Sequence, residues 1–306
     1  MELIKKQIHM NQWKGNVTTQ ITLDDDFIVP DTLDDMEQVM LDTGEIQIET
    51  VKNQGDKVAV KGKLEFQVLY RKESGGLQTL GGNIPFEEVV NVQGLEEKDY
   101  VGLNWMLEDL NTDMINSRKL GVQAIITLQV RVETLRDVEA AVDVDMENNS
   151  RPAGAGISDT DGAGQVQVET LKRTANAAAI AVRRKDTYRI KEELSLTGGK
   201  PNIGQLLWRE MKLRDVTAKP LDGRLHLDGE LSVFVIYGAE DENMPVQWLE
   251  ETIPFSGDME MGDVKEDQIP MVTVRLAHKD MEAKPDYDGE MREMDVDAVL
   301  ELDIKL

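Results

Sequence analysis

The sequence predicts an all-β fold made of two duplicated antiparallel β-sandwich domains, each with one short helix. Three observations lead to this prediction: one stretch of sequence occurs twice, apolar and polar residues alternate inside each copy, and turn signals separate short segments. We place the first domain at 1–146, an acidic and glycine-rich loop at 147–165, and the second domain at 166–306. A closed β-barrel is the alternative arrangement for such strands.

The duplication is marked by three pairs of segments that occur in the same order in both halves of the chain. Residues 57–70 align without a gap on residues 224–237, and an Ile-Pro-Phe string follows each of them, at 84–86 and 253–255. The third pair consists of Val122, Ala124, Ile126, Leu128 and Val130 in the first half and Val296, Ala298, Leu300, Leu302 and Ile304 in the second. Three pairs in one order indicate a duplicated domain.

Apolar residues recur at every second position within each copy, which is the pattern of a half-buried strand. We expect the following residues to point into the two cores: Leu64, Phe66, Val68 and Tyr70 in the first copy, and Leu225, Leu227, Leu231, Val233, Val235 and Tyr237 in the second. Phe234 and Ile236 make the outer face of the second strand partly apolar, so we expect that face to meet a second layer. Counted in this way, each copy has about seven strands.

One short helix is predicted in each copy. In the first copy it covers residues 31–41, where Leu33, Met36 and Met40 are spaced three and four residues apart and an aspartate and a threonine provide N-cap candidates. The counterpart in the second copy is residues 202–208.

Two glycines stand at matching points of the alternating strands. Gly62 and Gly229 each lie inside a strand pattern, where a glycine marks a bulge or a close approach of another group to the backbone. Between the copies, residues 147–165 contain too few apolar side chains to order their backbone, so we expect a mobile loop there.

The charge and composition exclude several classes of partner and site. The chain has 34 Lys+Arg and 59 Asp+Glu, a formal net charge of −25, so its surface repels nucleic acid and anionic membranes. No apolar stretch approaches the roughly 18 residues of a membrane span, so no membrane insertion is expected. The absence of cysteine excludes disulfides, zinc thiolate sites and cysteine nucleophiles.

Histidines and paired aspartates are the residues that would hold a metal ion. His9, His226 and His278 are too far apart for a local metal motif, and we interpret them as exposed strand residues, with metal binding as the alternative. The strings 159–162 and 286–289 both read Asp-x-Asp-Gly and resemble the start of a calcium loop, but neither continues with the required ligands. We interpret them as turns, with weak calcium binding as the alternative.

The carboxylates do not form a recognisable catalytic motif. Asp295, Asp297, Glu301 and Asp303 lie on one face of a predicted strand, which we attribute to solvation and protection of a sheet edge. Nucleophile-elbow, phosphate-binding, dinucleotide-binding and zinc-protease strings are all absent. We therefore predict no catalytic, cofactor-binding or metal residues, no cofactor and no enzymatic activity.

The four tryptophans allow two interpretations. Trp13, Trp105, Trp208 and Trp248 are scarce large aromatics, and core or interdomain packing is the preferred use of such residues. Stacking against a glycan is the alternative, and Trp248 is the candidate for it because it lies in a short segment before the second Ile-Pro-Phe string.

The repeated unit resembles the SPOCS domain family of spore-forming Firmicutes. The resemblance rests on a strand of the form G-x-L-x-[FV]-x-[VL]-[LI]-Y followed by I-P-F, found at 62–70 with 84–86 and again at 229–237 with 253–255. Residues 179–190 and 285–292 are similar to the SipL group of spore coat morphogenetic proteins within this family. The resemblance extends over nearly the whole chain.

The resemblance implies a non-enzymatic structural protein of spore coat assembly. Such proteins are made in the mother-cell cytoplasm, act at the forespore surface through contacts with other coat proteins, and bind the ATPase SpoIVA through a C-terminal LysM domain. This sequence has no LysM pattern and stops at Leu306 directly after a strand, so we expect the native chain to continue and SpoIVA binding to depend on the extension. A glycan-binding or adhesive β-sandwich module and a carboxylate-dependent hydrolase remain the alternatives.

Overall fold

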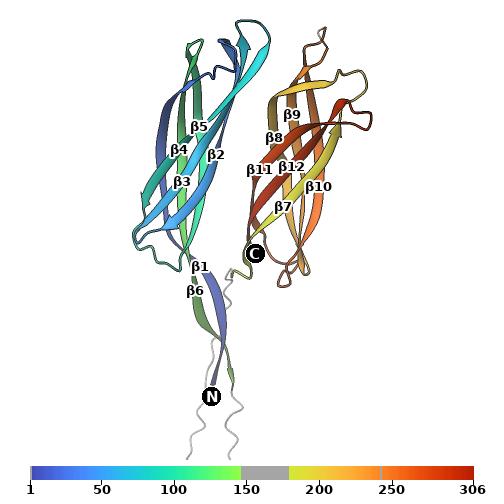
Figure 1. The fold of residues 1–306 in the computed structure, drawn as a ribbon. Coiled ribbons are helices and arrows are strands. Elements are labelled where there is room, and N and C mark those ends of the chain that lie inside the picture. The colour runs from blue at the N-terminus through green and yellow to red at the C-terminus, as the bar shows by residue number, and fades with distance from the viewer. Residues whose placement is uncertain (1, 146–178, 242) are drawn as a thin grey trace, which may run out of the picture. The chain divides into compact units, whose positions relative to one another are not determined.

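The computed structural model describes residues 2–145, 179–241 and 243–306, and the strands in these ranges form two sets of six (Figure 1). Repeat 1 consists of β1 (Glu2–Ile28), β2 (Met36–Asn53), β3 (Lys57–Lys72), β4 (Leu77–Asn91), β5 (Tyr100–Asn116) and β6 (Lys119–Asp145). Repeat 2 consists of β7 (Arg183–Ser195), β8 (Ile203–Leu221), β9 (Arg224–Ala239), β10 (Val246–Glu260), β11 (Met271–Pro285) and β12 (Met291–Lys305). The all-β prediction is confirmed, with six described strands in each copy rather than seven.

Each repeat contains two antiparallel sheets of three strands. In repeat 1 the strand orders are β1-β6-β5 and β2-β3-β4, and in repeat 2 they are β11-β12-β7 and β10-β9-β8. Strands at the same place in the two repeats therefore have the same neighbours, with β3 and β9 central in one sheet and β6 and β12 central in the other. The described residues include no helix, and so none that could cross a membrane.

The core of each repeat lies between its two sheets, because the alternating residues turn their apolar side chains inward. All residues that the alternation predicts to be inward on β3, β6, β9 and β12 are buried, from Leu64 at the start of the first set to Ile304 at the end of the last. They form one apolar cluster in each repeat. Burial at about 25 cal/mol per Å² of apolar surface is the main stabilising contribution in such a sandwich.

The helices predicted at 31–41 and 202–208 are wrong, because both segments enter strands that contain β-bulges. The pairing of β2 with β3 shifts between Met36 and Gln38 and again between Val39 and Leu41. The pairing of β8 with β9 shifts at the two equivalent places. Each bulge adds one residue to the strand, so successive inward residues such as Met36 and Val39 are three apart instead of two. This spacing imitates the period of a helix.

Gly62 and Gly229 mark close approaches of aromatic rings. Gly62 pairs with Phe86, and a Cβ atom at Gly62 would lie 2.8 Å from Phe86 Cζ and 2.6 Å from the backbone oxygen of Gln47. Gly229 pairs with Phe255, whose Cζ would lie 2.6 Å from such an atom. The strands that carry the two glycines pair with β4 and β10 without a register shift; the irregularities lie in the neighbouring strands β2 and β8.

Contacts between Cα atoms divide the chain into two compact units. Of the described residues, 2–12, 135–145, 179 and 180 belong to one unit, which includes the first part of β1 and the last part of β6. The other unit contains 13–134 and the described residues of 181–306, and with them the cores of both sandwiches. In the first unit, His9 Nδ1 is hydrogen-bonded to Asp137 Oδ1 at 2.5 Å. The loop expected at 147–165 lies outside the described residues.

Candidate interaction surface

Aromatic and charged side chains gather where repeat 1 meets repeat 2. The Tyr100 hydroxyl donates to Asp303 Oδ2 at 2.5 Å, and the Arg183 guanidinium carbon lies 3.2 Å from the Tyr100 ring centroid. Glu133 accepts from Arg183 at 2.9 Å and from Lys305 at 2.8 Å. Burial raises the pKa of Tyr100 to about 12, and the hydrogen bond to Asp303 acts in the same direction. This tyrosine is therefore a fixed hydrogen-bond donor at neutral pH.

A second contact of the same kind lies beside the first. The guanidinium carbon of Arg275 lies 4.0 Å from the centroid of the Trp105 ring, a cation–π arrangement. Arg275 also donates to the backbone oxygen of Leu103 at 3.2 Å and to Asn104 Oδ1 at 2.5 Å. Burial lowers the pKa of Arg275. The planar, multiply hydrogen-bonded guanidinium orients β11 of repeat 2 on β5 of repeat 1.

An apolar patch completes the contact between the repeats. Its members are Leu69 and Leu77 of repeat 1 and Leu207, Trp208, Phe234 and Ile236 of repeat 2. Thr79 of β4 donates its hydroxyl hydrogen to the backbone oxygen of Leu207, the extra residue of a β8 bulge. Phe234 and Ile236, which sequence alternation places on the outer face of β9, therefore border an apolar layer.

An open groove of about 540 Å³ runs between the contacts. It is lined by the equivalent segments 44–46 and 211–213 and by the equivalent segments 105–107 and 274–276. The only acidic residue in this lining is Glu45, which is ion-paired with Lys279 at 2.5 Å. The groove thus does not hold the pair of carboxylates that a glycoside hydrolase requires.

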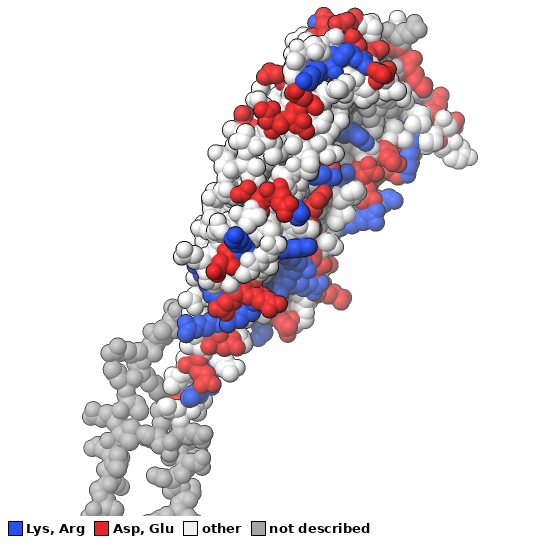
Figure 2. All heavy atoms as spheres, turned by 60° about the vertical axis from the view of Figure 1, so that its left-hand side comes forward, with Lys and Arg blue, Asp and Glu red and all other residues white. Residues whose placement is uncertain are grey.

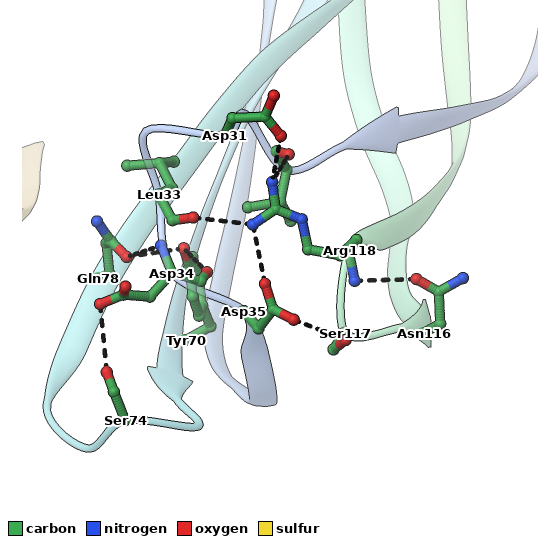
Figure 3. A network of polar contacts seen from close by, with 11 residues as sticks. Asp31, Leu33, Asp34, Asp35, Tyr70, Ser74, Gln78, Asn116, Ser117 and Arg118 are labelled. Atoms are coloured by element: carbon green, nitrogen blue, oxygen red, sulfur yellow. Dashed lines mark hydrogen bonds and ion pairs between the residues drawn. The ribbon is translucent and has the colours of Figure 1, made fainter.

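The loop before β2 is held by a polar network around Arg118 (Figure 3). The guanidinium donates, at 2.9 Å each, to the backbone oxygens of Val29 and Leu33 and to the carboxylates of Asp31 and Asp35. The hydroxyl of Tyr70 reaches the same loop and donates to the backbone oxygen of Asp34 at 3.0 Å. Figure 3 shows Arg118 pointing into the loop from the strand end opposite it. The network fixes the loop, and the Arg118 guanidinium uses its donors on four oxygens of that loop.

Repeat 2 holds its equivalent loop in the same way. Arg292 donates to the backbone oxygen of Lys200 at 2.9 Å and to Asn202 Oδ1 at 3.1 Å. Tyr237, which is equivalent to Tyr70, donates to the backbone oxygen of Pro201 at 3.2 Å. Because an arginine and a tyrosine hold this loop in both repeats, we assign these contacts to the stability of the domain fold and not to a functional site of one copy.

The three histidines lie on different strands, and His9 and His226 form surface ion pairs. His226 lies between Asp258, at 2.6 Å, and Asp228, at 3.0 Å, and the hydrogen bond to Asp258 raises its pKa. His278 lies at the bulge of β11. Within the described ranges, no three histidine, aspartate or glutamate side chains are grouped so that they could hold a metal ion.

The second Asp-x-Asp-Gly string forms a turn whose first carboxylate bonds to the backbone. Asp286 Oδ1 accepts from the backbone N–H groups of Asp288 and Glu290, at 3.0 Å each, and Gly289 has a φ of +85°. The other string, at 159–162, lies outside the described residues.

The acidic face of β12 does not protect a sheet edge, because β12 is the central strand of its sheet. Its carboxylates pair instead with side chains on neighbouring elements. Asp297 forms an ion pair with Arg189 of β7, Asp295 with Lys284 of β11, and Asp303 accepts from Tyr100. The edge-protection interpretation is therefore wrong, and cross-strand pairing explains these residues.

The tryptophans separate into two classes. Trp105 and Trp208 lie in the contact between the repeats, whereas Trp13 and Trp248 are exposed. Figure 2 shows one face of the molecule, on which acidic and basic side chains are interspersed. On this face the charges do not gather into a patch of one sign.

Comparison with known proteins assigns both repeats to one family. The family described as "SipL, SPOCS domain" matches residues 35–115 and 202–284, one segment in each repeat and together more than half of the chain. Neither curated proteins nor solved structures gave a match. The family implies a role connected with sporulation and the spore coat. On the strength of both matches, this chain belongs to the SipL SPOCS-domain family.

Proposed function

We propose that this chain is a non-enzymatic structural protein that helps to assemble the spore coat through protein–protein contacts. In this proposal it is made in the mother-cell cytoplasm and acts at the forespore surface. Family membership supports the setting. The proposed partners are other coat proteins, and SpoIVA is the first to test because the resemblance implies it.

The observation that carries the proposal is the chemistry of the contact between the repeats. Tyr100, whose pKa burial raises, lies at this contact with the stacked guanidinium of Arg183. Arg275, stacked on a tryptophan, and the buried Trp208 also hold one SPOCS domain against the other. Aromatic and arginine side chains are the residues that dominate protein–protein recognition. The surface of this domain is therefore suited to binding a folded protein surface.

Glycan binding is a second candidate, favoured by the exposure of Trp248. Its ring lies 5.3 Å from Lys200 Nζ and 6.4 Å from the ring of Phe234, which forms a small aromatic surface. Binding of spore peptidoglycan fragments that is lost in Trp248→Ala and kept in Tyr287→Ala would favour this function. Tyr287 is the matched control because it is an exposed aromatic in a turn on the other sheet.

Deletion of the gene in its native sporulating host tests the structural function. Thin-section electron microscopy should show a coat that is detached from the forespore or misplaced, and the wild-type gene should restore it. A normal coat in the deletion strain would contradict the proposal.

The non-enzymatic part of the proposal has its own control. Complementation with His226→Ala should restore the coat as well as the wild type does, because His226 is placed in a surface ion-pair cluster and not in the contact between repeats. Failure of a stably folded His226→Ala protein would indicate chemistry at that histidine.

A further inference from the structure

A charged cluster in repeat 2 takes no part in the contact between the repeats. It lies at the end of β10, an edge strand of the sheet β10-β9-β8. We call His226 and Asp228 of β9 together with Asp258 of β10 the His226 cluster. His226 stands directly opposite Asp258 in the β9–β10 ladder, so the cluster joins the edge strand to its neighbour.

Both ring nitrogens of His226 face a carboxylate. Nδ1 lies 2.6 Å from Asp258 Oδ1, and Nε2 lies 3.0 Å from Asp228 Oδ2. A neutral imidazole has one N–H donor and one acceptor nitrogen, whereas an ionised carboxylate can only accept. The neutral ring can therefore serve one of the two carboxylates and turns a lone pair toward the other. Only the protonated ring donates to both.

The other charged groups near the imidazole come from three strands. Lys219 of β8 stands opposite it, and Arg224 of β9 is ion-paired with Asp258 at 3.1 Å. From the other sheet, Arg184 of β7 donates to the backbone oxygen of Glu260 at 3.2 Å. Lysine, arginine and carboxylate side chains keep their charge through the neutral range, in which a histidine changes its own. The imidazole is thus the switchable member of this cluster.

Repeat 1 has the same strand end without the histidine. Ala59 of β3 and Val89 of β4 occupy the positions equivalent to His226 and Asp258, and they stand opposite each other in the same way. The ion pair on this ladder joins Lys61 to Glu87 at 2.9 Å and contains no group that titrates near neutral pH.

The backbone closes both strand ends in the same way. After β10, the Met261 N–H donates to the backbone oxygen of Gly223 at 2.9 Å, and after β4 the Val92 N–H donates to that of Asp56 at 2.8 Å. These residues occupy equivalent positions in the two repeats. The two strand ends therefore share their backbone closure and differ in their side chains, which makes β4 an internal reference for β10.

We propose that protonation of His226 fastens the end of β10 to β9, and that loss of this proton loosens the strand end. The equivalent end of β4 does not respond. An edge strand that opens exposes backbone groups able to pair with another strand, so weak acid closes this edge of repeat 2 and weak alkali opens it. The inference goes beyond the proposed coat function and does not rest on it.

The direction of the pH effect follows from linkage. The hydrogen bond to Asp258 raises the pKa of His226 above its ordinary value of 6.5. A group with a raised folded-state pKa contributes stability that is complete below the unfolded pKa and is lost as the pH rises through the folded one. The β10 end should therefore be held most firmly below about pH 6.5 and least firmly in weak alkali.

Nuclear magnetic resonance on the purified chain measures the first consequence. The ring signals of His226, identified by their loss in His226→Gln, should titrate with a pKa above 6.5. In Asp258→Asn and in Asp228→Asn the pKa should fall, because an asparagine amide can accept from or donate to the ring and so satisfies its neutral form. A wild-type pKa at or below 6.5 would overturn the proposal without any variant.

Hydrogen exchange measures the hold on the strand itself. The backbone amides of 256–260 at the end of β10 are compared with those of 87–91 at the equivalent end of β4, in one sample and after correction for intrinsic exchange rates. Between about pH 6 and about pH 9, protection at 256–260 should fall by about twofold or more relative to 87–91. His226→Gln should remove this difference, and circular dichroism checks that the variant is folded.

Equal pH dependence at the two strand ends, or a difference that persists in His226→Gln, would overturn the proposal. These outcomes are separate from that of the proposed function. The histidine changes the hold on one strand end and performs no chemistry, which agrees with the complementation expected of His226→Ala.

Discussion

Phe86 lies opposite Gly62 across the β3–β4 ladder, and its ring occupies the space that a side chain at Gly62 would need. Phe255 and Gly229 stand in the same relationship in repeat 2. This pairing explains why a glycine in one strand and an Ile-Pro-Phe string in the next occur together in both copies. The intervening proline, Pro85 or Pro254, lies on an edge strand, where the missing N–H is tolerated.

Gly229→Ala should destabilise repeat 2 by about 1–3 kcal/mol, because the new methyl group must displace the Phe255 ring. Combining it with Phe255→Leu should cost less than the sum of the two single changes. Thermal and urea unfolding of the four proteins measure this coupling.

Gly102→Ala is the matched control, since its nearest neighbour to a new Cβ atom would be Tyr100 Cε1 at 3.7 Å. It should change stability by no more than about 0.5 kcal/mol. If the losses of unfolding free energy from Gly229→Ala and Phe255→Leu simply added in the double variant, the Phe255 ring would not be what excludes a side chain at position 229.

Arg118→Lys should lower the stability by about 1–3 kcal/mol, because a lysine ammonium cannot reach the two carbonyls and two carboxylates that the guanidinium serves. Arg71→Lys is the control. Arg71 forms a more exposed pair with Glu37 at 2.7 Å and should lose at most about 1 kcal/mol. Equal losses in chemical denaturation would mean that the Arg118 network does not hold the loop.

Tyr100→Phe should alter the dependence of stability on alkaline pH. The folded state raises the pKa of Tyr100 from about 10 to about 12, so its contribution is complete below pH 10 and is lost as the pH rises through 12. The loss should be about 1–2 kcal/mol after solvent screening. The difference between wild type and Tyr100→Phe should therefore shrink over this range.

Unfolding free energies at several pH values between 9 and 12 measure this difference, with Tyr287→Phe as the control that should follow the wild type throughout. A difference that stays constant across the range would show that the Tyr100 hydroxyl is not held by burial and Asp303.

Calcium and chelators should leave the melting temperature within about one degree of its original value, because a ligand that does not bind the native state cannot stabilise it. The Asp286 carboxylate, the first of its string, is already bonded to two backbone N–H groups. Differential scanning calorimetry provides the measurement. A rise of several degrees with calcium would reveal a site.

The strands with unbroken alternation could be predicted from the sequence, and the bulged strands could not. The apolar residues between Leu64 and Tyr70 occur at every second position, so the sequence predicts that they are buried, as they are. At Met36 and Ile203 a bulge changes the spacing to three, which local pattern alone cannot distinguish from a helix. The position of β12 in the middle of its sheet depends on β7 and β11, which are distant in sequence.

The arginine network could have been found from the repeat in the sequence, although the alternation of apolar residues does not reveal it. Arg118 precedes Val122 by the same number of residues as Arg292 precedes Val296, so its recurrence marks it as part of the domain. The contact between the repeats left one signal, the partly apolar outer face of β9 at Phe234 and Ile236. The rest of it left none: Met40 and Leu207 are the extra residues of equivalent bulges, and only the tertiary structure shows that Leu207 is covered and Met40 is not.

The position of the tagged native gene product in sporulating cells tests the central claim most directly. If the protein is a structural component of coat assembly, fluorescence microscopy should show a shell around the forespore once engulfment begins, with little signal elsewhere in the mother cell. An even distribution of the tagged protein through the mother cell at every stage of sporulation would contradict the claim.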